Sequence, residues 1–120
     1  QIVSLADVRR ALKMFETVAV PVLGVIENMS YFVPPDMPEK RYDIFGAGGG
    51  SAFADEMGVP FLGEVPIGIE VRESGDKGIP VVIRSPDSPQ SKAFRKTAEE
   101  VARQVSIEAM KPELVIMSRV

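Results

Sequence analysis

Polar side chains begin directly after an apolar run, Val20 to Ile26, that predicts a buried strand. The segment that follows the run is Glu27-Asn28-Met29-Ser30. In open α/β sheets, ligands bind beyond the carboxyl ends of the strands. An asparagine in that position can offer its side-chain amide as both donor and acceptor to the edge of a nucleobase. The alternative is that Asn28 ends the strand by capping its own turn. The residues alone leave both interpretations open.

The glycine-rich segment 46–51, Gly-Ala-Gly-Gly-Gly-Ser, invites comparison with phosphate-binding loops and fails in detail. The pattern G-x-G-x-x-G requires glycine where Ser51 stands, and G-x-x-x-x-G-K-[ST] requires a Gly-Lys pair, which the sequence lacks. Because the glycines precede a predicted helix, some affinity for an anion is conceivable. The sequence favours a sharp turn into that helix, for which glycine is well suited.

Three carboxylates, Asp36, Glu39 and Asp43, carry oxygen ligands of the kind that hard cations prefer. Their spacing does not match an EF-hand and Lys40 and Arg41 stand among them, so a solvated loop is favoured and no metal site is predicted. The sequence contains no cysteine and no histidine. It therefore excludes disulfides, Cys/His zinc sites, thiolate-ligated iron–sulfur clusters and Ser-His-Asp or Cys-His catalysis by these residues. No catalytic residue is predicted.

The overall composition narrows the possible partners. Hydrophobic residues make up 45% and charged residues 26%, as in ordinary globular proteins. A formal net charge of -3 gives no electrostatic reason to bind nucleic acid or an anionic membrane. The longest apolar stretch, Val18 to Ile26, is too short to span a bilayer, and no signal peptide is visible. We expect a cytoplasmic protein with no nucleic-acid or membrane partner.

The elements that would position these residues alternate along the chain. Apolar residues at helical spacing predict helices, with Ser4 and Ser88 as N-caps, and runs that are apolar on both faces predict strands. The expected order is helix 4–17, strand 20–26, loop 30–46, helix 52–57, strand 59–66, helix 70–74, an extended or strand segment 79–83, and a last helix that begins at Pro89. This alternation indicates a three-layer α/β fold with a mainly parallel sheet.

Two further expectations follow from this order. The segments Val20–Ile26 and Phe61–Val65 are joined through a helix, so they should pair in parallel within one sheet. The aromatics of the long loop, Tyr31, Phe32, Tyr42 and Phe45, could form a partner-binding surface or hold the loop against the sheet, and both remain open. One domain is expected over residues 1–110, with residues 111–120 as a tail.

Several segments resemble, in the same order, those of the Mrp/ApbC family, which are nucleotide-binding proteins implicated in iron–sulfur cluster assembly. The most specific is the run from Val20 to Phe32, and the next is Asp43-Ile44-Phe45-Gly46 with the glycines after it. The run from Gly58 to Pro66, and Val71-Arg72-Glu73 with Gly75-Asp76, complete the set. The resemblance extends over about residues 1–105.

The resemblance implies the C-terminal part of a P-loop NTPase of the MinD-like class. It implies that the intact parent binds ATP and magnesium, forms a homodimer and serves iron–sulfur apoprotein clients. The family's asparagine near the adenine corresponds to Asn28, and its proline that lines the base pocket corresponds to Pro66. We take Ile67 and Gly68, which follow that proline, as further candidates for nucleotide contact.

Three departures from the family qualify this expectation. The family's phosphate loop and its magnesium-binding carboxylates lie upstream of where Gln1 stands, so we expect the chain alone to hydrolyse no ATP. Many members carry Cys-x-x-Cys where this sequence has Pro34 and Met37, so it offers no iron–sulfur ligands, and an aspartate after the base-pocket proline is replaced by Gly68. The alternatives are a MinD/ParA-like partner-binding ATPase without a cluster role, and a non-enzymatic interaction module.

Overall fold

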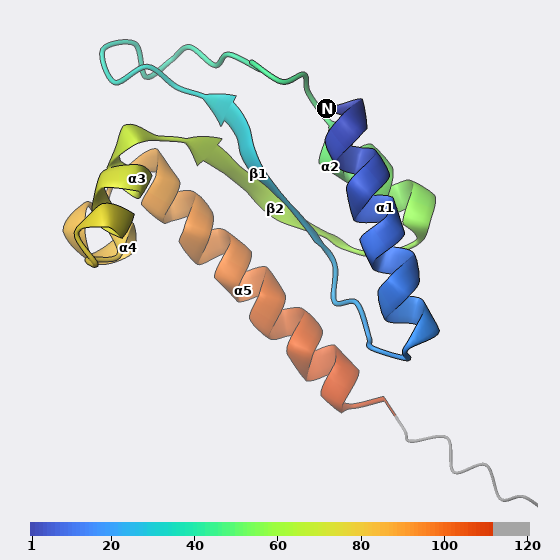
Figure 1. Cartoon of the computed structure of the whole chain (residues 1–120). Coiled ribbons are helices and arrows are strands. Elements are labelled where there is room, and N and C mark those ends of the chain that lie inside the picture. Colours follow the sequence, from blue (N-terminus) through green and yellow to red (C-terminus); the bar gives the residue numbers. More distant parts are fainter. Residues whose placement is uncertain (112–120) are drawn as a thin grey trace, which may run out of the picture.

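The structure is a computed structural model that describes residues 1–111. Its two strands lie side by side at the centre (Figure 1). The elements in chain order are α1 (Ile2–Thr17), β1 (Val25–Phe32), α2 (Gly49–Met57), β2 (Phe61–Ile67), α3 (Ile69–Asp76), α4 (Val81–Arg84) and α5 (Pro89–Ala109). The predicted tail lies outside the described residues, apart from its first residue, Lys111. Within residues 1–111, no helix has the length and apolar character needed to cross a membrane.

Strands β1 and β2 are parallel, as the sequence predicts. Val25 lies opposite Phe61, and Asn28 lies opposite Val65. The chain between them passes through α2, and a crossover of this kind returns the second strand in the same direction as the first. The parallel arrangement brings the carboxyl ends of both strands to one edge of the structure.

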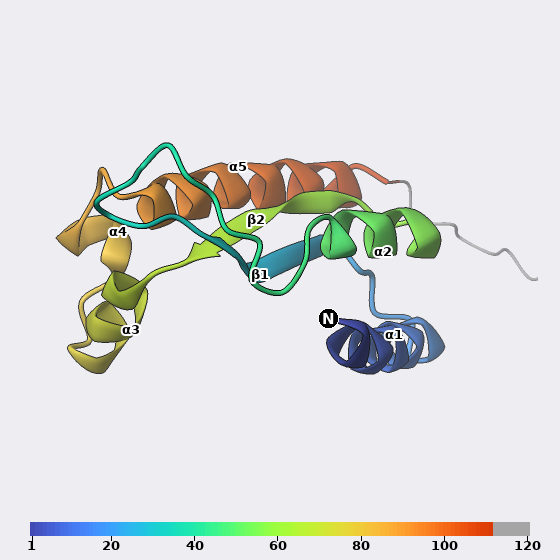
Figure 2. The ribbon, with the colours of Figure 1, turned by 90° about the horizontal axis from the view of Figure 1, so that it is seen from above.

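Helices cover the two strands from both sides. Seen from above in Figure 2, α5 lies along one side and α1 lies on the other, and α2 lies next to α1 in Figure 1. Helix α5 lies close to β2 at Gly63, where an added Cβ would lie only 2.8 Å from the hydroxyl oxygen of Thr97. The buried apolar side chains come from several elements and are those of Leu12, Phe53, Ala54, Leu62, Val65 and Val81. The arrangement is the predicted α/β fold.

The first strand begins and ends later than predicted. The prediction placed it at 20–26, whereas β1 runs from Val25 to Phe32. Pairing begins where the Val25 amide donates to the Pro60 carbonyl at 2.8 Å, just after Gly24, whose φ is +157°. The strand then continues through residues that the prediction assigned to the loop: after an irregularity beyond Asn28, Phe32 lies opposite Ile67 of β2 and also bonds to Tyr42.

The segment 79–83 is not a strand. Pro80 is the N-cap of the short helix α4, and the Ser85 amide donates to the Val81 carbonyl at 2.8 Å. Proline suits the start of a helix, where its missing N–H has no intrahelical acceptor. Burial of Val81 against the rest of the chain outweighs the strand preference of its β-branched neighbours.

Helix ends are predicted with mixed success. Gly58 ends α2 in the left-handed conformation, and the Ser88 hydroxyl accepts from the Ser91 amide at the start of α5, both as expected. Ser4, the predicted cap of the first helix, lies inside α1, whose N-cap is Gln1. The third helix extends past the predicted stop at Gly75 and ends at Asp76.

Candidate functional site

A cavity of about 410 Å³ lies where the carboxyl ends of β1 and β2 meet the start of α3. The four residues predicted to contact a nucleotide all line it: Asn28 at one strand, and Pro66, Ile67 and Gly68 at the other. The remaining lining residues are Met29, Val65, Ile69, Val71 and Arg72. Residues that lie far apart in the sequence are therefore brought to one concave and mainly apolar surface.

Asn28 uses one side-chain atom in its own turn. Its Oδ1 accepts a hydrogen bond from the Met29 amide at 2.9 Å, and Met29 has a φ of +54°, which non-glycine residues rarely adopt. The contact is local, as the turn-capping interpretation expected, but Asn28 does not end the strand, because β1 continues to Phe32. Within residues 1–111 the amide nitrogen of Asn28 has no hydrogen-bond partner, so the same side chain keeps a donor at the cavity.

Gln90, in the first turn of α5, closes the cavity from behind Gly68. Its Nε2 donates to the Ile67 carbonyl at 3.1 Å, and the side chain is buried. A Cβ added at Gly68 would lie 2.4 Å from that nitrogen. Gln90 was not predicted from the sequence. The available signal was helical spacing, because Gln90 stands four and eight residues before Phe94 and Ala98 and so shares their face of the helix.

We expect Gly68→Ala to lower the free energy of unfolding by about 1–3 kcal/mol, the usual range for overpacking. The added methyl group displaces Gln90 and leaves the partly buried Ile67 carbonyl without its partner. Urea denaturation followed by circular dichroism measures the change. The matched control is Gly75→Ala in α3, where an added Cβ meets no atom within 4 Å and alanine favours the helix. Equal stability of the two variants would contradict the prediction.

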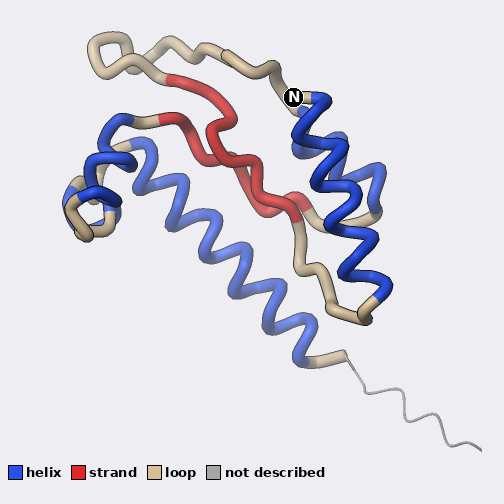
Figure 3. The backbone as a smooth tube through the Cα atoms, in the orientation of Figure 1, coloured by secondary structure: helices blue, strands red, loops and turns tan. Residues whose placement is uncertain are grey.

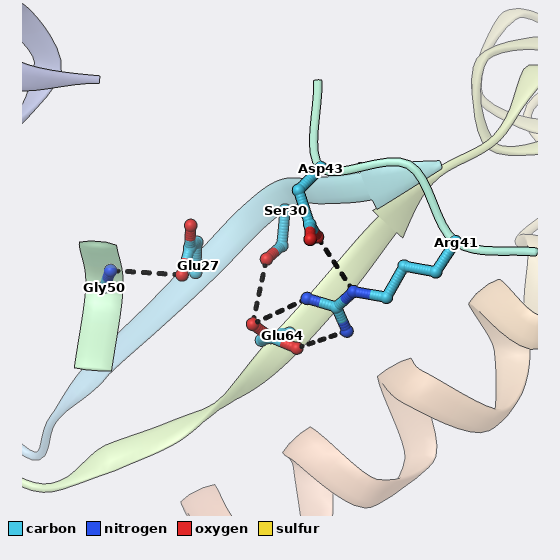
Figure 4. Close-up of polar contacts among 6 residues, drawn as sticks. All are labelled: Glu27, Ser30, Arg41, Asp43, Gly50 and Glu64. Carbon is cyan, nitrogen blue, oxygen red and sulfur yellow. Dashed lines mark hydrogen bonds and ion pairs between the residues drawn. The ribbon is translucent and has the colours of Figure 1, made fainter. Parts of the chain in front are cut away.

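A polar network holds the long loop to the strands (Figure 4). Arg41 donates to Asp43 at 2.8 Å and, through Nη1, to Glu64 of β2 at 3.1 Å, while the Ser30 hydroxyl donates to the same Glu64 carboxylate at 3.1 Å. The guanidinium also lies 3.8 Å from the centre of the Tyr31 ring. The bonds to Glu64, and then to Asp43, raise the pKa of Arg41 above its ordinary value. No signal in the local sequence pattern indicated this network.

The structure shows how the loop is held to the sheet, while the partner-binding role of its aromatics stays a prediction. Figure 3 shows the loop as the long irregular segment between β1 and α2. Tyr42 pairs with Phe32 through two backbone hydrogen bonds of 2.8 Å, and Tyr31 contacts Arg41, so the loop backbone is tied to the end of β1, although the Tyr42 side chain is 48% exposed. Phe45 is 46% exposed and its neighbour Ile44 is 57% exposed.

The glycine-rich segment turns the chain into α2, as predicted. Gly46 and Gly48 have φ values of +90° and +73°, and Gly48 is the N-cap of α2. The first turn of that helix already has an anion, because the Glu27 carboxylate accepts from the Gly50 amide at 3.1 Å (Figure 4). The protein's own carboxylate therefore occupies a place that a phosphate would need.

The positions of the family's cysteines form one tight turn. The Met37 amide donates to the Pro34 carbonyl at 3.1 Å, so these residues stand at the two ends of a β-turn. Neither residue supplies a thiolate. Among residues 1–111, no group of three His, Cys, Asp or Glu side chains could hold a metal ion, and Asp43 is paired with Arg41.

Solved structures with this fold are MinD-type ATPases and related nucleotide-binding proteins. The septum site-determining protein MinD with Mg-ADP from Pyrococcus horikoshii matches with a TM-score of 0.66 and 30% identity, over 92% of this chain and 41% of that one. A nucleotide-binding protein in complex with ADP from Archaeoglobus fulgidus matches with a TM-score of 0.54 and 36% identity, over 61% of this chain and 30% of that one. The fold is that of MinD-like P-loop ATPases.

The sequence comparison specifies the family. The family model "ParA: NUBPL iron-transfer P-loop NTPase" matches residues 1–102, and this chain belongs to that family. It is 52% identical over 110 residues to the iron–sulfur cluster carrier protein of Synechocystis and 46% identical over 107 residues to the iron–sulfur cluster transfer protein NUBPL of Dictyostelium discoideum. These matches cover 92% and 89% of this chain but 31% and 33% of the relatives' lengths.

Proposed function

We propose that the whole protein binds ATP with magnesium and carries iron–sulfur clusters to apoprotein clients, as a homodimer in the cytoplasm. In this proposal the present chain supplies the adenine side of the nucleotide pocket through Asn28, Pro66, Ile67 and Gly68. The observation that carries it is the single cavity that all four residues line at the carboxyl ends of two parallel strands. The names of the relatives and the ADP bound in two similar structures support the same proposal.

The proposed contacts follow from the chemistry of the four residues. The Asn28 amide nitrogen donates to a ring nitrogen of the base, while its oxygen remains on the Met29 amide. The ring of Pro66 and the side chain of Ile67 offer apolar surface to the base. Gly68 has no side chain that would narrow the cavity, and Gln90 behind it fixes the backbone through the Ile67 carbonyl.

We propose no binding site for the phosphates of ATP in this chain. The sequence lacks the Gly-Lys pair of a phosphate loop, and the start of α2 already holds Glu27. Magnesium likewise has no proposed ligand among residues 1–111. ATP hydrolysis by the whole protein therefore depends on groups outside these residues, and we propose no catalytic role for this chain.

The pocket assignment is tested by comparing adenosine, ADP and ATP on the 120-residue chain. We expect all three to bind weakly and within about threefold of one another, because phosphate contacts dominate affinity in P-loop proteins and are lacking here. Two-dimensional NMR of the isotope-labelled chain measures the dissociation constants and locates the affected amides at residues 28–29 and 67–69. No phosphate release from ATP is expected.

Two comparisons make this test specific. Asn28→Ala should weaken all three ligands equally, and guanosine should bind more weakly than adenosine because its edge presents different donors and acceptors. ATP binding more than about tenfold tighter than adenosine would contradict the proposal, because it would place a phosphate site in this chain. Amide shifts that avoid residues 28–29 and 67–69 would contradict the pocket assignment.

A MinD-like partner-binding ATPase without a cluster role is the second candidate. Two observations favour it: the match to MinD structures, and the lack of thiolates at Pro34 and Met37. Anaerobic reconstitution of the whole protein with iron and sulfide separates the two candidates. Stoichiometric cluster on the whole protein supports the carrier, and ATP turnover without any cluster supports the second candidate.

A further inference from the structure

A second and larger cavity lies between helices α3, α4 and α5. Figure 1 shows α3 and α4 next to the start of α5. Its volume is about 910 Å³, within the usual range of small-molecule sites, and only Val71 is shared with the lining of the proposed nucleotide cavity. The wall is mainly apolar, with two polar side chains, and comprises Val71, Ser74, Gly75, Gly78, Ile79, Pro80, Val81, Val82, Phe94, Arg95 and Ala98.

The first polar side chain, Ser74, is buried without a partner. It is 2% exposed, and among the described residues its Oγ has no hydrogen bond. The other buried serines differ: Ser30 donates to Glu64, and the Ser91 hydroxyl contacts the Val81 and Ser85 carbonyls. An unpaired buried hydroxyl is unfavourable and calls for an explanation, such as a ligand group that completes it.

The second polar side chain, Arg95, gives the cavity a positive charge. It is the one charged residue among those that line the cavity within residues 1–111. Of the three acidic side chains of neighbouring α3, Glu73 pairs with Arg84 and Asp76 pairs with Arg72, and Glu70 does not line the cavity. Within residues 1–111, Arg95 hydrogen-bonds to the Pro86 carbonyl and forms no ion pair, so its charge is not cancelled by a carboxylate of these residues.

We propose that this cavity binds a small aliphatic carboxylate. The apolar chain of the ligand occupies the space lined by Val71, Val82 and Phe94. Its carboxylate accepts hydrogen bonds from the Arg95 guanidinium and the Ser74 hydroxyl, which satisfies the orphaned group. The proposal is independent of the nucleotide site, because it uses different polar groups and needs no phosphate.

The test is a titration of the 120-residue chain with decanoate, decanol and decyltrimethylammonium below their micelle concentrations. We expect saturable binding of decanoate, at least about tenfold tighter than the cation, because one charge-assisted hydrogen bond accounts for a factor of that size. Isothermal calorimetry gives the affinities, and NMR shifts should concentrate at residues 71–82 and 94–98.

Three variants make the result specific. Arg95→Gln should remove the preference for the anion, and Ser74→Ala should weaken decanoate about threefold or more while it leaves the ligand-free melting temperature unchanged or higher. Ile83→Ser is the control, because Ile83 is 71% exposed and does not line the cavity. The proposal is overturned if the three amphiphiles bind equally, if decanoate does not saturate, or if Ile83→Ser reduces binding as much as Arg95→Gln. A lower melting temperature of ligand-free Ser74→Ala would overturn the role of the hydroxyl.

Discussion

Gly24→Ala is expected to lower the free energy of unfolding by about 2–5 kcal/mol, the sum of overpacking and backbone strain. A Cβ at this position would lie 2.5 Å from the backbone oxygen of Pro60 and 2.6 Å from Cγ of Leu62. The φ of +157° adds strain for any L side chain. Because the Pro60 oxygen accepts the first bond of the β1–β2 pair, from the Val25 amide, the clash cannot be relieved without opening the sheet. Urea denaturation measures the loss.

A comparison with Gly58→Ala isolates the contribution of the clash. Gly58 also has a positive φ, of +67°, but a Cβ there meets no atom within 4 Å. Its substitution should cost about 1 kcal/mol, the usual penalty for alanine in a left-handed helix cap. If Gly24→Ala costs no more than Gly58→Ala, the close approach of Gly24 to Pro60 is not a constraint on this fold.

The parallel pairing of the strands was predictable because it follows from the order of the elements, and that order can be read from local patterns of apolar residues. Apolar runs separated by a helical segment leave few arrangements for a small α/β protein. The meeting of Asn28 and Pro66 at one cavity was predictable for a related reason, since Asn28 stands just after one predicted strand, Pro66 stands at the end of the other, and parallel strands end at one edge. The proposed role of Ile67 and Gly68 rests only on their position after Pro66, a residue that the family resemblance identifies.

The strand boundaries were not predictable, because they depend on partners distant in the sequence. Glu27 and Ser30 are polar residues that local patterning assigns to a strand end or a loop. In the structure Glu27 accepts from Gly50 of α2, and Ser30 donates to Glu64 of β2. A strand can continue through polar residues when other elements satisfy them, and the local sequence pattern does not show those partners.

The short helix α4 shows a segment whose local propensity predicts the wrong secondary structure. The β-branched residues at 79–83 favour an extended chain by propensity alone. The Val81 carbonyl accepts from the Ser91 hydroxyl of α5, and the Val81 side chain is 7% exposed. Tertiary contacts of this kind outweigh a propensity of about 1 kcal/mol in a segment of four residues.

The 120-residue chain is expected to take up no iron–sulfur cluster after anaerobic reconstitution with iron and sulfide. A cluster needs thiolate ligands, or imidazole in some centres, and the sequence has neither cysteine nor histidine. Pro34 has no side-chain donor, and Met37 offers only a neutral thioether. The measurement is visible absorption together with iron counted per chain after desalting. Stoichiometric iron with that absorption would refute the prediction.

The matched comparison is the double variant Pro34→Cys/Met37→Cys. The hydrogen bond from the Met37 amide to the Pro34 carbonyl places the two positions at the ends of one turn, so each chain would offer a pair of neighbouring thiolates. Two chains together would supply the four ligands of a common cluster. We expect the variant to retain iron and the natural chain to retain none. If the variant also stays iron-free, missing thiolates are not the only barrier, and the geometry of the 33–45 loop excludes the cluster as well.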